Sequence, residues 1–123
     1  MPVKVADASV LAAVAFGEPQ ADEAVELLGG AVLHEPTLLA YELASVAHKK
    51  ALRYPDRVDA IAAALALALA LEIQWHEVDH RAVLGLALEK GLTTYDATYL
   101  YVARSVGAPL VTFDEKLRAA TRE

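Results

Sequence analysis

The chain has 123 residues, of which 56% are hydrophobic, and it carries a formal net charge of −6. This length predicts one domain over residues 1–123, and the apolar content excludes a disordered chain. There is no cysteine, which excludes disulfides and thiolate zinc sites. The acidic balance argues against a protein that holds nucleic acid by bulk electrostatics, but it does not exclude a nuclease whose metal supplies positive charge locally.

The first half of the chain alternates short β-like runs with longer helical runs. In order, the pattern predicts a strand over Val3–Ala6, helices over Ser9–Phe16 and Gln20–Leu28, a strand over Ala31–His34, a helix from an N-cap at Thr37 to about Leu52, and an Ala/Leu-rich helix opened by Pro55 and Asp56. Pro36 is expected to break the second strand, and His34 beside it is interpreted as a loop residue.

The second half continues the alternation. It predicts a strand over Ile73–Val78, a helix capped by Asp79 and ending at Lys90, a helix capped by Thr93 or Thr94 and ending near Ser105, a strand over Leu110–Thr112, and a final helix over Glu115–Thr121. Strands separated by helices favour a parallel sheet. The predicted fold class is therefore α/β, with a central, mostly parallel sheet of four to five strands flanked by helices on both faces.

The most apolar stretch, Ala60–Leu71, has 12 residues, whereas a helix that spans a bilayer needs about 20. The apolar run after Lys4 is too short for a signal peptide and has Asp7 at its edge. We therefore expect a cytoplasmic protein.

Isolated carboxylates carry most of the chemical information in the sequence. They are Asp7, Glu42, Asp96 and Asp114. Each lies in an apolar stretch or at its edge, where an unpaired charge is costly. Asp7 and Asp114 follow two predicted strands, and parallel sheets bind ligands outside the carboxyl ends of their strands. Since no basic partner is evident beside them, these acids indicate a hard divalent cation with oxygen ligands.

Each acid also has a structural interpretation. Asp7 and Asp114 could cap the helices that begin just after them, and Asp96 could interact with a helix dipole from the first turn. Glu42 is harder to explain in this way, because it lies mid-helix on the same face as Leu39. Independent caps would be separate coincidences, whereas one metal site explains all of the acids together.

Two further groups of polar residues each allow a structural and a functional interpretation. The hydroxyls of Ser9 and Thr112, each two residues from an acid, could bond a carboxylate or a metal-bound water, or simply form turns at strand ends. Lys49, Lys50 and Arg53 cluster at the end of the helix that carries Glu42. They suit a solvated face favoured by the helix dipole, and they also suit a contact with an RNA backbone.

The four acids fall in short segments whose order is informative. The segments are Val5–Leu11, Pro36–Glu42, Thr94–Tyr99 and Leu110–Asp114, and together they extend over nearly the whole chain. Each alone is a weak motif, whereas the ordered set is fairly specific. In this order and local setting, the chain resembles the PIN-domain ribonucleases, particularly the VapC-type toxins of toxin–antitoxin pairs.

The resemblance implies a single PIN-like nuclease domain that cleaves RNA with Mg²⁺ or Mn²⁺. It places the catalytic and metal-binding roles on Asp7, Glu42, Asp96 and Asp114, and a supporting hydroxyl on Thr112. A toxin of this kind would have a cognate antitoxin as its partner. The large apolar content of a small acidic chain also predicts a covered surface, and hence a homodimer.

Other functions remain as alternatives. His76, Glu77 and His80 match the H-E-x-x-H spacing of zinc peptidases, but that chemistry requires both histidines on one helix, and here the motif crosses a predicted strand–helix junction. An aspartyl phosphatase would want a second acid two residues after Asp7, where Ser9 stands. A non-catalytic interaction module of PIN fold is the main alternative from another class, because the same covered surface would serve it.

Overall fold

A computed structural model gives the structure of residues 2–122. The elements in chain order are β1 (Val3–Ala6), α1 (Ala8–Ala15), α2 (Ala21–Leu28), β2 (Val32–Pro36), α3 (Leu38–Arg53), the 3₁₀ helix η1 (Pro55–Arg57), α4 (Val58–Leu69), β3 (Ile73–His76), α5 (His80–Lys90), α6 (Thr94–Val106), β4 (Leu110–Val111) and α7 (Glu115–Thr121). The alternation of strands and helices follows the prediction from the sequence.

The strands form one sheet in the order β3-β2-β1-β4, and every neighbouring pair is parallel. Within residues 2–122 the sheet has four strands, so the predicted α/β class and parallel sheet are confirmed. Because all strands run the same way, the residues that follow β1, β2 and β4 meet at one edge of the sheet. Asp7 and Asp114 are brought to that edge from opposite ends of the chain.

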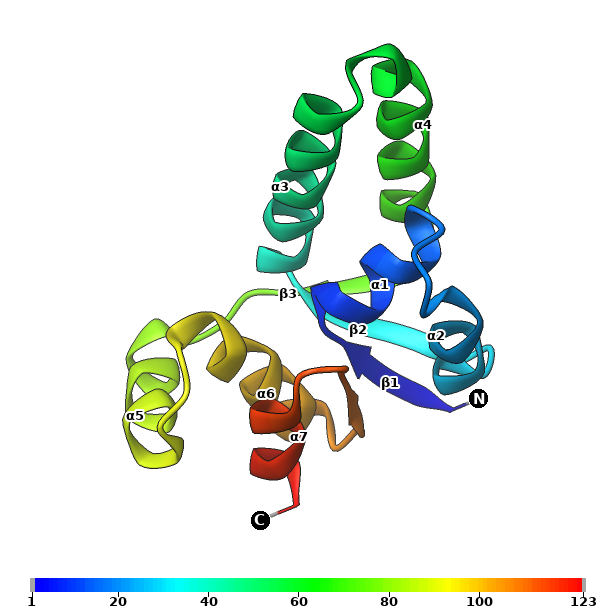
Figure 1. Cartoon of the computed structure of the whole chain (residues 1–123). Coiled ribbons are helices and arrows are strands. Elements are labelled where there is room, and N and C mark those ends of the chain that lie inside the picture. The colour runs from blue at the N-terminus through cyan, green and yellow to red at the C-terminus, as the bar shows by residue number, and fades with distance from the viewer. Residues whose placement is uncertain (1, 123) are drawn as a thin grey trace.

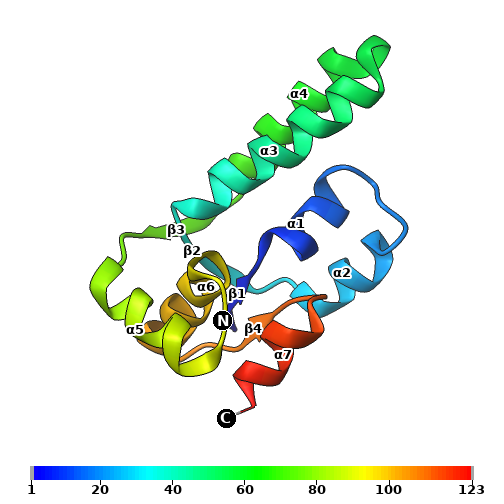
Figure 2. The ribbon, with the colours of Figure 1, turned by 60° about the vertical axis from the view of Figure 1, so that its left-hand side comes forward.

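Helices cover both faces of the sheet (Figure 1, Figure 2). α1 and α2 lie on one side, α5, α6 and α7 lie on the other, and α3 and α4 form a hairpin that projects away from the sheet. The largest core side chains are at most 1% exposed and include Val5, Val10, Leu39, Leu43 and Tyr99. Burying each such side chain contributes roughly 1.5–3 kcal/mol, and this core fixes α1, α3 and α6 around the end of β1.

The second strand is longer than predicted. β2 runs to Pro36, and His34 lies within the strand rather than in a loop. Pro36 does not break the strand because β1 has already diverged from it. The β1–β2 register covers Lys4 and Leu33, whereas β2 stays in register with β3 up to the pair of Pro36 and His76. A proline is tolerated where no ladder donor is required.

Strand ends and one cap differ from the prediction. β3 ends at His76 rather than Val78, because β2 supplies no partner beyond that point, and β4 ends at Val111 rather than Thr112. Thr37 precedes α3 as expected, but its side chain makes no capping hydrogen bond. Its backbone is already helical, at φ −58° and ψ −23°, whereas a capping side chain needs an extended backbone.

The Ala/Leu-rich stretch forms most of α4, which packs against α3 and α1. Among its residues Ala68 is buried, whereas Leu67 is 72% exposed. Much of this apolar helix therefore faces outward. Across residues 2–122, no helix combines the length and apolar character needed to cross a membrane.

Candidate active site

Asp7 lies at the centre of the site, directly after β1. Its side chain is 5% exposed. The carboxylate accepts hydrogen bonds from Ser9 Oγ at 2.6 Å, from Thr112 Oγ1 at 2.5 Å and from the Val10 N–H at 3.4 Å. Asp7 therefore does cap α1, but the capping bond is the longest of the three and exceeds the usual range for such bonds. The side chain is held mainly by the two hydroxyls.

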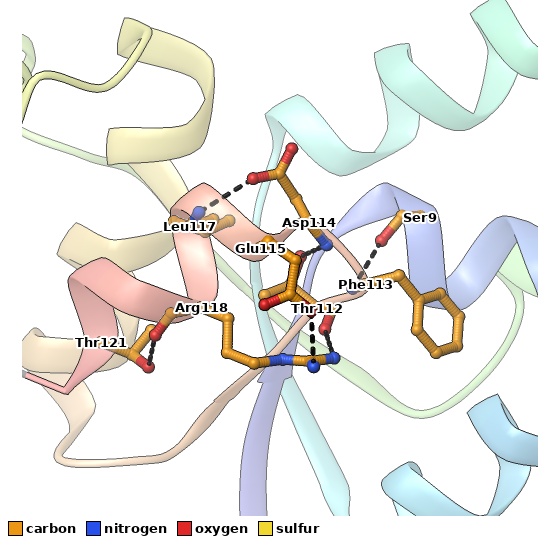
Figure 3. Close-up of polar contacts among 8 residues, drawn as sticks. All are labelled: Ser9, Thr112, Phe113, Asp114, Glu115, Leu117, Arg118 and Thr121. Carbon is orange, nitrogen blue, oxygen red and sulfur yellow. Dashed lines mark hydrogen bonds and ion pairs between the residues drawn. The ribbon is translucent and has the colours of Figure 1, made fainter.

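These two hydroxyls fix how Asp7 is oriented. Ser9 Oγ also accepts a hydrogen bond from the Phe113 N–H at 3.2 Å, and Thr112 Oγ1 accepts one from the Asp114 N–H at 3.0 Å (Figure 3). Each hydroxyl has one proton, and because its oxygen already accepts from an N–H, that proton is directed to Asp7. The turn after β4 is thereby tied to the end of β1, and Asp7 is presented as an acceptor.

Asp114 lies at the start of α7. Its Oδ1 accepts a hydrogen bond from the Leu117 N–H at 2.8 Å, and its second oxygen points away from that helix (Figure 3). Arg118 closes the turn by donating to the Thr112 carbonyl at 2.8 Å and to Glu115 at 3.0 Å. The capping interpretation of Asp114 is therefore correct. The cap uses one carboxylate oxygen and leaves the other for a further ligand.

Glu42 is joined to α6 across the site. Its Oε1 accepts a hydrogen bond from the Tyr99 hydroxyl at 2.6 Å, and Tyr99 is 1% exposed. Burial raises the pKa of Glu42, and the charges of Asp96 and Asp7 raise it further against the effect of the Tyr99 bond. Burial and the bond to Glu42 raise the pKa of Tyr99, so the phenol stays protonated and acts as a donor.

Asp96 lies in the first turn of α6, where its N–H donates to the Thr93 side chain that caps the helix. Burial raises the pKa of Asp96, and the negative charges of Asp114 and Asp7 raise it further, whereas Thr93 and Lys116 lower it. A first-turn interaction with the dipole and proximity to other acids are therefore both present.

The structure brings the four predicted acids within electrostatic range of one another. Asp7 raises the pKa of both Glu42 and Asp96, and Asp114 raises that of Asp96. Burial raises the pKa of Asp7 itself, against the hydrogen bonds from its hydroxyl partners. Repulsion of this kind is relieved either by taking up a proton or by binding a cation.

A fifth acid, Glu35, belongs to the site and was not predicted from the sequence. Its side chain is 0% exposed, and its Oε2 accepts a hydrogen bond from the Ala6 N–H at 2.8 Å. The Ala6 N–H faces β2, but β1 and β2 have diverged there and no backbone carbonyl of β2 accepts from it. The Glu35 carboxyl group takes the place of that carbonyl, directly before Asp7. Oε1 has no hydrogen-bond partner. Burial, reinforced by the charge of Asp7, raises the pKa of Glu35 to about 9.

A signal for Glu35 was present in the sequence. In a strand, alternate residues face the same side, so a β2 that continues past His34 places Glu35 with the buried Leu33. The expectation that Pro36 ends the strand early concealed this pattern. Because a carboxyl group with a pKa of about 9 is protonated at neutral pH, Glu35 adds little negative charge to the site.

The histidines of the H-E-x-x-H match do not share a helix. His76 ends β3 and His80 begins α5. Instead, His76 Nε2 lies 2.7 Å from Nδ1 of His34 on the neighbouring strand, within hydrogen-bond distance. The helical geometry required of a zinc peptidase is therefore absent from this motif.

The acidic residues have the ligand chemistry of a divalent-cation site. Carboxylate oxygens are the ligands that Mg²⁺ and similar ions prefer, and an oxygen that accepts one hydrogen bond keeps a second lone pair. Among residues 2–122, no three His, Cys, Asp or Glu side chains are already grouped closely enough to hold a metal ion. The acids therefore fit a divalent cation in ligand chemistry, and a shared metal site on them is a proposal.

Comparison with known proteins identifies the family. The PIN domain family profile matches residues 4–123. This chain belongs to the PIN-domain family. Ribonuclease VapC3 of Pyrobaculum aerophilum is 33% identical to it over 118 residues, which cover 92% of this chain and 90% of that protein. The resemblance to VapC-type PIN-domain proteins is therefore confirmed. Nucleases of this type generally use divalent metal ions.

Solved structures agree with this assignment. The protein PAE2754 from Pyrobaculum aerophilum superposes on this PIN domain with a TM-score of 0.78 and 33% sequence identity, covering 98% of this chain and 87% of its own. VapC20 of Mycobacterium tuberculosis, described as a sarcin–ricin loop cleaving toxin, superposes with a TM-score of 0.74 and 20% identity, covering 95% and 94% respectively. At that lower identity, the likeness shows the fold alone.

Proposed function

We propose that this PIN domain is a divalent-metal-dependent endoribonuclease that cleaves single-stranded RNA. The observation that carries the proposal is the convergence of acids at one edge of the sheet. Asp7 and Asp114 follow β1 and β4 there, and Glu42 and Asp96 lie on α3 and α6, close enough to Asp7 for its charge to raise the pKa of both. Helix capping does not require so many acids in one place, whereas a cation site does. Nuclease activity is supported by the VapC homologues. Mg²⁺ or Mn²⁺ is the proposed ion, because carboxylate sites suit both.

The roles of the side chains follow from their contacts. We assign direct binding of the cation to Asp7, Asp96 and Asp114. Glu42 either joins them or orients the attacking water, and Tyr99 positions it. Ser9 and Thr112 are supporting groups, because both donate to Asp7. When bound, a divalent cation offsets charge on the phosphodiester and lowers the pKa of a bound water.

Cleavage in the presence and absence of metal tests this function. The purified protein is expected to cleave a single-stranded RNA oligonucleotide in Mg²⁺ or Mn²⁺ and to lose that activity in EDTA, because the acids alone repel a phosphate. His76→Ala serves as a control and should leave cleavage largely intact, since His76 pairs with His34 at the end of β3. Cleavage that persists in EDTA, or that only Zn²⁺ restores, would contradict the acidic site.

We also propose that the chain is the toxin of a toxin–antitoxin pair. The cognate antitoxin would insert a basic side chain, best an arginine, among the acids, because a guanidinium group pairs bidentately with carboxylates. Exposed apolar side chains on the α3–α4 hairpin support a covered surface, in a homodimer or under the antitoxin. They include Leu52 at 70% exposure and Leu67 at 72%.

Growth of cells that express the chain alone tests the toxin proposal. Wild-type protein is expected to slow growth, whereas Asp7→Ala, which lacks the central carboxylate, should not. The comparison requires matched protein levels. If both strains grow equally, the toxin role is wrong, whereas the nuclease function would still stand on the cleavage assay.

A further inference from the structure

A surface hollow of about 380 Å³ opens beside Glu42. Residues of three helices line it, among them Ala8 of α1, Leu38, Tyr41 and Lys49 of α3, and Tyr95 of α6. Glu42 belongs both to this lining and to the proposed metal site. The hollow is therefore continuous with the place where a phosphodiester would be cleaved.

Two aromatic rings in this lining are not used by the core. Tyr41 is 75% exposed and Tyr95 is 62% exposed. Each is the immediate neighbour in sequence of a site acid, Glu42 or Asp96, on a separate helix. Large aromatic side chains left in water next to a functional site mark a binding surface, because a ring offers apolar area together with a polar tip.

Charge limits what could bind here. The chain has a net charge of −6, and the hollow borders a group of acids, so attraction to phosphates supplies little of the affinity for RNA. Stacking of bases on aromatic rings does not depend on phosphate charge and tolerates any base sequence. Lys49 is the basic side chain among the residues that line the hollow, and it suits a single phosphate contact.

We propose that Tyr41 and Tyr95 stack on unpaired nucleobases that flank the cleaved phosphodiester, an inference that rests on the proposed ribonuclease function. One ring is presented by α3 beside Glu42 and the other by α6 beside Asp96, and the Tyr99–Glu42 hydrogen bond joins these two helices. Bases in a duplex are already stacked and cannot offer their faces. The two tyrosines therefore select single-stranded RNA and position it over the carboxylates.

Steady-state kinetics on an RNA oligonucleotide test the role of each ring. Tyr41→Ala and Tyr95→Ala are each expected to raise KM by roughly ten-fold while kcat changes less than about two-fold, because stacking acts in binding. Tyr41→Phe and Tyr95→Phe keep a ring and should behave like the wild type. Alanine favours helices, so these variants keep the fold. Tyr54→Ala is the matched control, because Tyr54 is also exposed, at 43%, but is not among the residues that line the hollow. Tyr54 follows the last residue of α3, and its ring lies beside Arg53 and Arg57.

Abasic substrates identify what the rings contact. Removing the bases beside the cleaved bond should raise KM for the wild type but have no further effect in the Tyr41→Ala/Tyr95→Ala double variant. If the abasic penalty is unchanged in the double variant, or if KM stays at the wild-type value in an enzyme that cleaves RNA, the stacking role is overturned and the hollow receives another partner. A wild type that cleaves no RNA would overturn the proposed function and this inference with it.

Discussion

Replacement of Asp7 by asparagine will lower RNA cleavage by about 100-fold or more, the scale on which loss of one charge-stabilising group acts. The charge of Asp7 raises the pKa of both Glu42 and Asp96. Removing this charge therefore affects the site more than removing a peripheral one. Asparagine retains the size of the side chain and an oxygen that accepts from a hydroxyl. The loss should therefore come from the missing charge and not from altered packing.

The same variant should remain folded. Because burial raises the pKa of Asp7, its ionised form opposes folding near neutral pH, and a neutral side chain removes that cost. Asparagine can accept from only one of the two hydroxyls, because the other carboxylate oxygen becomes an NH₂ donor, and this loss offsets the gain. In EDTA, the melting temperature of Asp7→Asn is therefore expected to stay within about 5 °C of that of the wild type. Asp79→Asn is the matched control, because Asp79 caps α5 through the Arg81 and Ala82 N–H groups outside the site. Cleavage by Asp7→Asn within about three-fold of the wild type would contradict a role at the reacting centre.

The buried Glu35 gives the largest expected effect on stability. In the unfolded chain its carboxyl group titrates near 4.5, whereas burial raises the pKa in the fold to about 9. Between these values the folded protein binds a proton that the unfolded chain releases. Stability from this group is complete below the lower pKa and is lost as the pH rises through the upper one. Between the two pKa values the loss is about 1.4 kcal/mol for each pH unit.

Urea unfolding at a series of pH values in EDTA measures this effect. From pH 6 to pH 8 the wild type should lose about 2–3 kcal/mol more than Glu35→Gln, which carries no ionisable group at this position. The glutamine amide protons are unpaired in the core, which lowers the free energy of unfolding of Glu35→Gln by the same amount at every pH. The two proteins are therefore compared by how steeply the free energy of unfolding changes with pH. Glu72→Gln, at an exposed position, should follow the wild type. Parallel pH profiles for the wild type and Glu35→Gln would show that Glu35 is ionised when buried.

Much of the fold was predictable from the sequence because its local signals agree with its tertiary structure. Asp79 was recognised as a cap and accepts the expected N–H bonds, and of the two candidates Thr93 and Thr94 it is Thr93 that caps its helix. The alternation of strands and helices was sufficient to place Asp7 and Asp114 at one edge of a parallel sheet. The prediction failed where tertiary pairing overrides a local rule. Pro36 remains in a strand because β3 pairs with it and β1 does not.

The candidate site was predictable only in part. Isolated acids in apolar segments can be recognised from the sequence, because burial of a charge requires a reason. The contacts that orient them depend on distant parts of the chain, such as the bond from Thr112 to Asp7 or from Tyr99 to Glu42. Glu35 was missed because Pro36 was expected to end the strand early, which hid the alternation that places Glu35 with the buried Leu33. Its bond to the Ala6 N–H depends on where β1 and β2 diverge, which is a tertiary feature.

Calorimetric titration of Mn²⁺ at neutral pH tests most directly whether the acids form one metal site. The wild type and Asp79→Asn should bind Mn²⁺ alike, because Asp79 lies outside the site. Each of four single variants should weaken that binding by about ten-fold or more, since each removes a charge from the same cation. They are Asp7→Asn, Glu42→Gln, Asp96→Asn and Asp114→Asn. Wild-type affinity in all four variants would contradict a shared metal site and leave the acids as helix caps and buried partners.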